Sequence, residues 1–171
     1  LETTYSLKAT AATVLNVTED HMNRYADLEE YRQAKLNIYH HCQTAVINGE
    51  DPLTKEDDKQ SAQQQVSFAE NNADYWLKTE NGKKYLMAKD KLILACDEIK
   101  LTGRHNHMNA LAAIALAQAA GIKNSGILTA LRTFPGLAHR FQLAHMANGV
   151  RWVNDSKATN VGSTVAALTG L

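Results

Sequence analysis

The sequence lacks most of the features that would assign it to a specialised class of protein. It has only two cysteines, Cys42 and Cys96, and their spacing is not that of a metal site. We therefore expect buried, reduced thiols of a cytoplasmic protein. No run of about 18 apolar residues occurs, which argues against a membrane-spanning helix. The 18 lysines and arginines balance the 18 aspartates and glutamates, so no overall charge attracts nucleic acid or an anionic membrane.

Several sequence signals are also absent. There is no Gly-x-x-x-x-Gly-Lys-Ser/Thr phosphate loop, so any phosphate binding by these residues must use local positive groups. No internal repeat and no signal-peptide pattern are present. The chain starts at Leu1 rather than at methionine, and it stops at residues 164–171, where an apolar helical face is beginning. We therefore expect a fragment of a larger protein.

What is present is typical of a soluble globular α/β protein. Hydrophobic residues make up 44% and charged residues 21% of the chain. Apolar, β-prone runs predict strands, and near-helical spacing of apolar residues predicts helices. The predicted strands are residues 11–17, 45–48, 65–68, 75–78, 84–87, 92–101, 141–146 and 150–153, and the predicted helices are residues 28–41, 106–121 and 125–133.

Turn residues divide the chain into two predicted domains. Asn81-Gly82 predicts a hairpin with a type I′ turn, and Asn148-Gly149 predicts a second hairpin. Pro135-Gly136 stops the last of these helices and is the expected end of an α/β domain. The predicted domains are therefore residues 1–136 and 137–171.

The polar run Val153-Asn154-Asp155-Ser156-Lys157-Ala158-Thr159-Asn160 follows a predicted strand and precedes a helix. Such a position is a common ligand site in α/β proteins. Asp155 could accept hydrogen bonds from ribose hydroxyls, and Lys157 could neutralise a phosphate or a carboxylate. A helix that begins near residues 162–164 would direct its positive end toward bound anions. A simple turn with a helix cap explains the run equally well.

Two further polar groups have similar alternatives. Asn106 and Asn109 lie three residues apart at the start of the Ala-rich helix, so they share one face and could recognise a purine edge. Spacing alone favours capping for one asparagine and solvent exposure for the other. Arg140 follows the predicted domain boundary, where it could bind a phosphate with two parallel hydrogen bonds. A surface arginine at the start of a strand is the alternative.

A third group follows the first predicted strand. His21 comes directly after Asp20 in a loop, and Lys35 lies on the next predicted helix. Neutral histidine is a frequent metal ligand, although a lone histidine is more often a surface or hydrogen-bonded group. Lys35 can bind a cation only after its amine becomes an acid, for example by carbamylation with carbon dioxide. Residue patterns give no sign of that modification, and an exposed helix lysine is the simpler interpretation.

Together these motifs resemble the Mur ligase family, the ATP-dependent amide ligases that build the peptidoglycan stem peptide. Over nearly the whole chain, five segments occur in the family's order: LNVTEDHMNRY, YRQAKLNIY, LTGRHNHMNALAAIALAQAAGI, FPGLAHRF and VNDSKATNVGSTVAAL. The run NDSKATN resembles the branch of the family that adds D-glutamate to UDP-N-acetylmuramoyl-L-alanine. The resemblance implies an incomplete P-loop-type central domain, followed by the start of a Rossmann-like C-terminal domain.

The resemblance implies a cytoplasmic, monomeric enzyme of cell-wall precursor synthesis, without nucleic-acid or membrane partners. ATP would phosphorylate the carboxylate of the UDP-precursor, and the amine of D-glutamate would then displace phosphate. Magnesium and cationic side chains would offset the charge on the oxygens. The alternatives are another Mur-type ligase, a ligase similar to folylpolyglutamate synthase, and a non-catalytic nucleotide-binding domain.

Individual residues match functional positions of the family. His21 and Lys35 match magnesium ligands, the lysine after carbamylation, and with Lys157 they are the expected catalytic residues. Asn106 and Asn109 match adenine contacts. The other implied roles are phosphate and ribose contacts for Arg140 and Asp155, the acyl-phosphate and D-glutamate site for Lys157 and Thr159, and the muramoyl substrate for Asp20.

The chain also departs from the family pattern. The phosphate loop is expected well before Leu1, and a metal-binding glutamate is expected a few residues upstream, which Glu2 does not match. Much of the D-glutamate pocket, including a further lysine and a serine, is expected after Leu171. The resemblance therefore implies that this chain alone is inactive, and that Lys35 can remain unmodified in it for want of metal and partner ligands.

Overall fold

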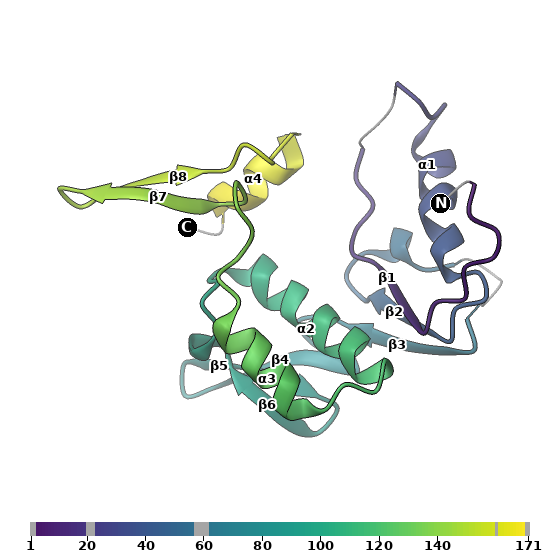
Figure 1. Cartoon of the computed structure of the whole chain (residues 1–171), viewed down its shortest axis with the longest axis horizontal. Coiled ribbons are helices and arrows are strands. Elements are labelled where there is room, and N and C mark those ends of the chain that lie inside the picture. The colour runs from purple at the N-terminus through teal and green to yellow at the C-terminus, as the bar shows by residue number, and fades with distance from the viewer. Residues whose placement is uncertain (1–2, 20–22, 57–61, 160, 170–171) are drawn as a thin grey trace.

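The computed structural model describes residues 3–19, 23–56, 62–159 and 161–169, and this part of the chain has the predicted α/β architecture (Figure 1). The strands are β1 (Ala11–Val14), β2 (Thr44–Asn48), β3 (Gln64–Phe68), β4 (Tyr75–Glu80), β5 (Lys83–Ala88), β6 (Lys91–Ala95), β7 (Gln142–Ala147) and β8 (Val150–Asn154). The α-helices are α1 (Leu28–Leu36), α2 (Arg104–Ala119), α3 (Asn124–Thr133) and α4 (Val161–Thr169). Short 3-10 helices cover Asn37–Tyr39, Pro52–Thr54 and Cys96–Glu98.

The first six strands form one mixed sheet in the order β1-β2-β3-β4-β5-β6. The pairs β1-β2, β2-β3 and β3-β4 are parallel, whereas β4-β5 and β5-β6 are antiparallel. The turn between β4 and β5 is the predicted one, since Asn81 and Gly82 have φ angles of 51° and 75°. Parallel pairing places the carboxyl ends of β1, β2 and β3 at the same edge of the sheet.

Helices cover both faces of the sheet. Side chains alternate between the two faces along a strand, so neighbouring residues of one strand pack against different helices. In β2, Ala45 and Ile47 belong to a buried cluster that includes Tyr31 and Leu36 of α1. Val46, which lies between them, belongs instead to the cluster that contains the buried side chains of α2. Burial on both faces explains why β2 is an almost uninterrupted apolar run.

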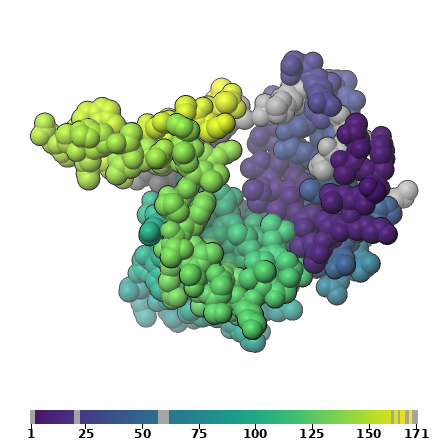
Figure 2. Space-filling view, in the orientation of Figure 1, coloured from purple at the N-terminus to yellow at the C-terminus, as the bar shows by residue number. Residues whose placement is uncertain are grey.

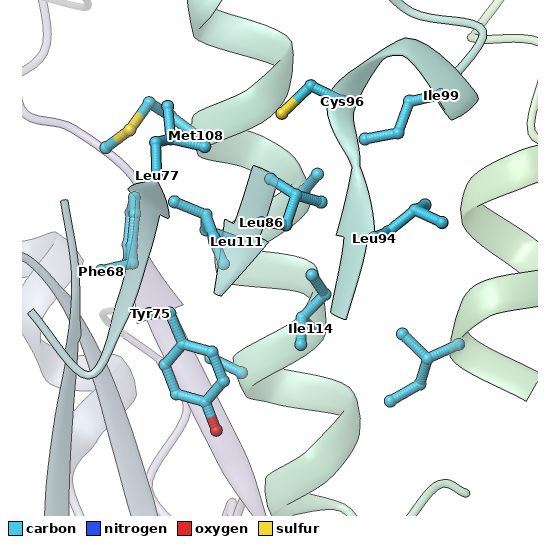
Figure 3. Packing of buried hydrophobic residues seen from close by; sticks show 14 of the residues in the cluster. Phe68, Tyr75, Leu77, Leu86, Leu94, Cys96, Ile99, Met108, Leu111 and Ile114 are labelled. Carbon is cyan, nitrogen blue, oxygen red and sulfur yellow. The ribbon is translucent and has the colours of Figure 1, made fainter. Parts of the chain in front are cut away.

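The larger core lies between α2 and the strands of the sheet (Figure 3). Leu111 and Ile114 of α2 are fully buried, in one cluster with Leu86 of β5 and Leu94 of β6. Small buried side chains such as Ala115 let the helix lie close to the strands. The Ala- and Leu-rich sequence of α2 therefore serves as the main packing surface of this part of the chain.

Tyr39 connects the end of the α1 segment to β1. Its side chain is fully buried, and its hydroxyl accepts a hydrogen bond from the Val14 backbone N–H (2.9 Å). Burial raises the pKa of Tyr39 to about 12, so the hydroxyl stays protonated. This contact fixes the point at which the chain leaves β1 toward the predicted metal-ligand loop.

The helix predicted over residues 28–41 is shorter than expected. Asp27 caps α1 with its side chain, and the α-helix ends at Leu36. The chain then continues as a 3-10 helix through Tyr39, and His41 has a φ angle of 59°, which no right-handed helix allows. The tighter turn lets the tyrosine ring reach the buried cluster under β1.

Two predicted strands are also too long. The strand predicted over residues 92–101 ends at Ala95, where the 3-10 helix Cys96–Glu98 begins. β1 stops before Val17, whose backbone N–H donates to Asp51 Oδ2 (2.8 Å) rather than to a strand. The apolar composition suggested continued strand pairing in both places. A 3-10 helix replaces that pairing after Ala95, and the contact with Asp51 replaces it at Val17.

After α3 the chain forms a separate two-stranded sheet of β7 and β8, and this hairpin projects from the body of the molecule (Figures 1 and 2). Asn148 and Gly149 have φ angles of 51° and 77°, as the predicted turn requires. At the junction Gly136 has a φ angle of 90°, a backbone conformation that residues with a side chain rarely adopt, so a substitution there would be strained. The domain boundary at this glycine remains a prediction. None of the described helices is long and apolar enough to cross a membrane.

Candidate functional site

The loops that follow β1, β2 and β3 are joined at the carboxyl edge of the sheet. Asn48 Nδ2 donates to the Leu15 carbonyl (2.9 Å), so the end of β2 holds the chain after β1. The Glu70 N–H donates to Glu50 Oε1 (2.7 Å), which joins the loops after β2 and β3. Open α/β sheets bind ligands outside the carboxyl ends of their strands. This edge is therefore the candidate functional site.

Lys35 reaches this edge from the last turn of α1. Its Nζ donates to the Asn16 carbonyl (3.2 Å) and lies 4.6 Å from the centroid of the Tyr31 ring. A carbonyl oxygen and the face of an aromatic ring both attract an ammonium group. The side chain is partly buried, so Lys35 is not the freely exposed helix lysine of the simpler interpretation.

Of the two magnesium ligands that the family resemblance implies, only Lys35 lies within the described residues. Asp20 and His21 lie outside the described residues. Across residues 3–19, 23–56, 62–159 and 161–169, no group of three or more His, Cys, Asp and Glu side chains could hold a metal ion. Lys35 fits its implied role in one respect, because a carbamate on its Nζ would place oxygen atoms at the carboxyl edge. The unmodified ammonium cannot bind a cation.

The two predicted adenine contacts lie at the start of α2. The helix begins after its N-cap residue Gly103, which has a φ angle of 98° and no side chain that could cap the helix. Asn106 Nδ2 donates to the Thr102 carbonyl (2.7 Å), and Asn109 is exposed one turn further on. The capping alternative is therefore wrong for both asparagines, whereas solvent exposure is correct for Asn109. A carboxamide pair on the first turns of α2 can offer donors and acceptors to a flat ligand.

An ion-pair network at the start of α2 was not found by sequence analysis. Arg104 is the first residue of the helix, and its guanidinium pairs with Glu50 and with Glu70 (Nε to Oε2, 3.0 Å). Lys84 of β5 also pairs with Glu70 (3.3 Å). Hydrogen bonds from Arg104 and then Lys84 hold the pKa of the Glu70 carboxyl below its ordinary value. The one available sequence signal was an acidic residue shortly after each of two predicted strands.

His107 lies next to this network on α2. Its Nδ1 atom is buried and has no hydrogen-bond partner within the part of the chain that the structure describes. Burial is the main cause that lowers the pKa of His107, and the nearby charges of Lys84 and His105 lower it further. The imidazole is therefore neutral in the folded protein at about pH 7.

We expect His107 to make the folded state less stable as the pH falls. An unfolded histidine binds a proton with a pKa of about 6.5, and the folded value is lower, so the unfolded state takes up the proton first. The contribution of His107 to stability is complete above that unfolded pKa and is lost as the pH falls below it toward the folded value. Thermal unfolding at about pH 7.5 and about pH 5.5 should show a smaller loss in His107→Gln than in the parent. Equal losses in the two proteins would contradict this assignment.

A second set of predicted residues meets where the chain enters the β7–β8 hairpin. Asp155 Oδ1 accepts a hydrogen bond from the Phe141 N–H (3.0 Å), and the Lys157 N–H donates to the His139 carbonyl (3.1 Å). The predicted phosphate residue Arg140 therefore lies in the same junction as Asp155 and Lys157. The Asp155 carboxylate shapes the turn in this structure, as the turn interpretation requires.

The structure does not join this junction to the other predicted groups. Arg140, Lys157 and Thr159 are exposed. Among the described residues, no hydrogen bond or ion pair connects the junction to the start of α2 or to Lys35. The described site residues thus form three separate groups, which lie at the start of α2, at the junction before the β7–β8 hairpin and near the end of β1.

These features define an α/β protein with its candidate ligand site at the carboxyl ends of parallel strands, beside the start of a helix. Comparison with known proteins identifies the family. The family described as Mur ligase middle domain matches residues 2–117, and the chain belongs to the Mur ligase family.

The most informative relatives are bacterial enzymes named UDP-N-acetylmuramoylalanine–D-glutamate ligase. The chain is 76% identical to the one from Pasteurella multocida and 72% identical to one from Haemophilus influenzae, over all 171 residues in each comparison. It spans 39% of the length of each of these relatives.

Solved structures of the family share the fold. MurF from Acinetobacter baumannii aligns with a TM-score of 0.77 at 24% identity, over 96% of this chain and 37% of that protein. MurC from Thermotoga maritima aligns with a TM-score of 0.70 at 25% identity, over 95% of this chain and 38% of that protein. The predicted α/β fold of the Mur ligase central domain is thereby confirmed.

Proposed function

We propose that this chain is part of a ligase, commonly called MurD, that joins D-glutamate to UDP-N-acetylmuramoyl-L-alanine at the expense of ATP. The observation that carries the proposal is the identity of 76% to the D-glutamate ligase of Pasteurella multocida over the whole chain. The run NDSKATN supports the same branch of the family. The proposed enzyme acts in the cytoplasm as a monomer, without nucleic-acid or membrane partners.

The proposed reaction has two steps. A carboxylate oxygen of the UDP-precursor attacks the terminal phosphorus of ATP, and ADP leaves, which gives an acyl phosphate. The D-glutamate amine then attacks the carbonyl carbon, the tetrahedral intermediate expels phosphate, and the nitrogen loses a proton. Phosphorylation is needed because a carboxylate is a poor electrophile, and cationic groups are needed because negative oxygens crowd together in both steps.

The described residues fit parts of this reaction. Asn106 and Asn109 would hold the adenine, and Arg140 and Asp155 would contact phosphate and ribose. Lys157 would neutralise the acyl phosphate, and Thr159 would line the D-glutamate site beside it. These contacts would bind and orient the reactants, which is the main requirement for transfer between two bound substrates. Residues 1–136 would form the central domain and residues 137–171 the start of the C-terminal domain.

The proposed metal site lies at the end of β1. A carbamylated Lys35 and His21 would hold magnesium, which supplies positive charge beside the phosphate oxygens when it is bound. Asp20 would face the muramoyl substrate. The position of Lys35 Nζ at the Asn16 carbonyl supports this placement.

The test is phosphate release by the complete ligase that contains this chain. We expect release only when ATP, UDP-N-acetylmuramoyl-L-alanine and D-glutamate are all present. Omission of each substrate in turn, and replacement of D-glutamate by L-glutamate, are the controls. A folded and pure ligase that releases no phosphate with all three substrates would refute the proposed function.

A further inference from the structure

We propose that Arg104 is a positioning residue, which fixes the start of α2 over the ends of β2 and β3 and thereby sets the orientation of Asn106 and Asn109 toward the nucleotide base. This inference rests on the proposed function, since it assumes that the two asparagines bind the base of ATP. The residue itself is assigned from contacts in the structure.

The contacts of Arg104 join three separate elements. The residue begins α2, and its guanidinium pairs at once with Glu50 after β2 and Glu70 after β3. The two glutamates are themselves connected, because the Glu70 N–H donates to Glu50 Oε1 (2.7 Å). Lys84 of β5 donates to the other oxygen of the Glu70 carboxylate (Nζ to Oε1, 3.3 Å). One arginine therefore closes a network between the helix and three strands.

The N-terminus of α2 lacks a capping side chain at its N-cap residue. That residue is Gly103, and its positive φ angle of 98° is a conformation that glycine adopts freely. The contact of Asn106 with the Thr102 carbonyl holds the first turn to the preceding segment, and Arg104 adds the contacts to the loops after β2 and β3. A cation on the first turn of a helix also opposes the helix dipole. The two carboxylate partners of Arg104 offset this unfavourable placement, and they set the direction of the helix start.

The network is poorly suited to a stabilising role. The Arg104 side chain is 54% exposed, and ion pairs between exposed groups contribute little to the stability of a fold. The planar guanidinium nevertheless fixes geometry, because its hydrogen bonds to two carboxylates restrict both distance and angle. Asn106 follows two residues later and Asn109 one turn after that, so the orientation of the helix start is passed to both carboxamides.

Loss of Arg104 should therefore weaken recognition of the base more than it affects the chemistry. In the complete ligase, Arg104→Gln should raise the KM for ATP by roughly three- to tenfold and lower the preference for ATP over GTP by a similar factor. Its kcat and its KM for D-glutamate should stay within about twofold of the parent. Arg104→Lys should recover only part of the loss, since an ammonium group cannot bridge both carboxylates in one plane.

Two further variants separate positioning from a general effect. Arg132→Gln removes an arginine of similar exposure on α3, which pairs with Glu98 and makes no contact with Glu50 or Glu70, and should leave both nucleotide measurements unchanged. Glu70→Gln should reproduce part of the Arg104→Gln effect, and the double variant should not be additive, because both changes break one network. Thermal unfolding of each variant shows whether the fold is intact.

The inference would be overturned if Arg104→Gln keeps the KM for ATP and the preference for ATP over GTP within about twofold of the parent. If Arg104→Gln does not fold, the same criterion applies to Arg104→Lys. Equal changes in Arg132→Gln, or full additivity with Glu70→Gln, would also contradict it. Binding of fluorescent ATP and GTP analogues gives the same comparison without turnover. If the parent ligase releases no phosphate, the proposed function is refuted. If the parent is active and Arg104→Gln leaves the KM for ATP and the preference for ATP over GTP unchanged, only the role of Arg104 is refuted.

Discussion

Replacement of Lys35 by alanine is expected to lower turnover of the complete ligase by roughly 100-fold or more, the range in which removal of a charge-stabilising or metal-supporting group falls. Lys35 Nζ lies at the end of β1, beside the Asn16 carbonyl, where a carbamate would direct its oxygens into the candidate site. No neighbouring lysine on α1 can take over this position, because Lys35 is the single lysine of the helix. The measurement is phosphate release at saturating substrates.

Chemical rescue distinguishes a carbamate from an ordinary ammonium group. Added formate or acetate should restore part of the activity of Lys35→Ala, because a small carboxylate can occupy the place of the missing carbamate. Lys91→Ala, which changes an exposed lysine at the start of β6, is the matched control and should keep full activity. Near-normal turnover of Lys35→Ala would refute the carbamate role.

Leu111→Ala should destabilise the folded chain by about 3 kcal/mol, within the range of roughly 2–5 kcal/mol for a fully buried leucine. Leu111 lies at the centre of the core between α2 and the sheet and has a relative exposure of 0% (Figure 3). The expected loss combines the transfer free energy of the removed methyl groups with the cavity that remains. Urea unfolding followed by circular dichroism gives the free energy of unfolding.

Leu92→Ala is the control for this second prediction. Leu92 is a leucine of the same sheet with a relative exposure of 55%, so its truncation should change the free energy of unfolding by no more than about 0.5 kcal/mol. If Leu111→Ala and Leu92→Ala cost the same, the packing described between α2 and the sheet would be wrong.

Much of the fold was predictable because local signals and tertiary structure agree. The Ala- and Leu-rich run of α2 with Gly121 behind it, and the Asn-Gly turns of both hairpins, specify their conformations within a few residues. The errors occur where tertiary contacts decide. The 3-10 helix Asn37–Tyr39 forms where the tyrosine is buried, and Val17 leaves the strand direction to bond Asp51.

The candidate site was less predictable, because its contacts join residues that are distant in the sequence. Arg104 and Glu50 are 54 positions apart, and no local pattern couples them. The buried Nδ1 of His107 likewise depends on packing around α2. For Lys35 the residue pattern indicated only an ordinary helix lysine. Its role in metal binding was inferred from the family resemblance alone. Those implied site roles remain predictions.

The proposed function implies that this chain can take the place of the matching segment in a D-glutamate ligase. The most direct measurement replaces the matching segment of the Pasteurella multocida ligase, to which the chain is 76% identical, with this chain and identifies the product by mass spectrometry. With ATP, UDP-N-acetylmuramoyl-L-alanine and an equimolar mixture of D-glutamate, L-alanine and diaminopimelate, we expect a single product that carries D-glutamate, formed within about tenfold of the parent rate. A folded hybrid that forms no product, or that attaches a different amino acid, would refute the proposed function.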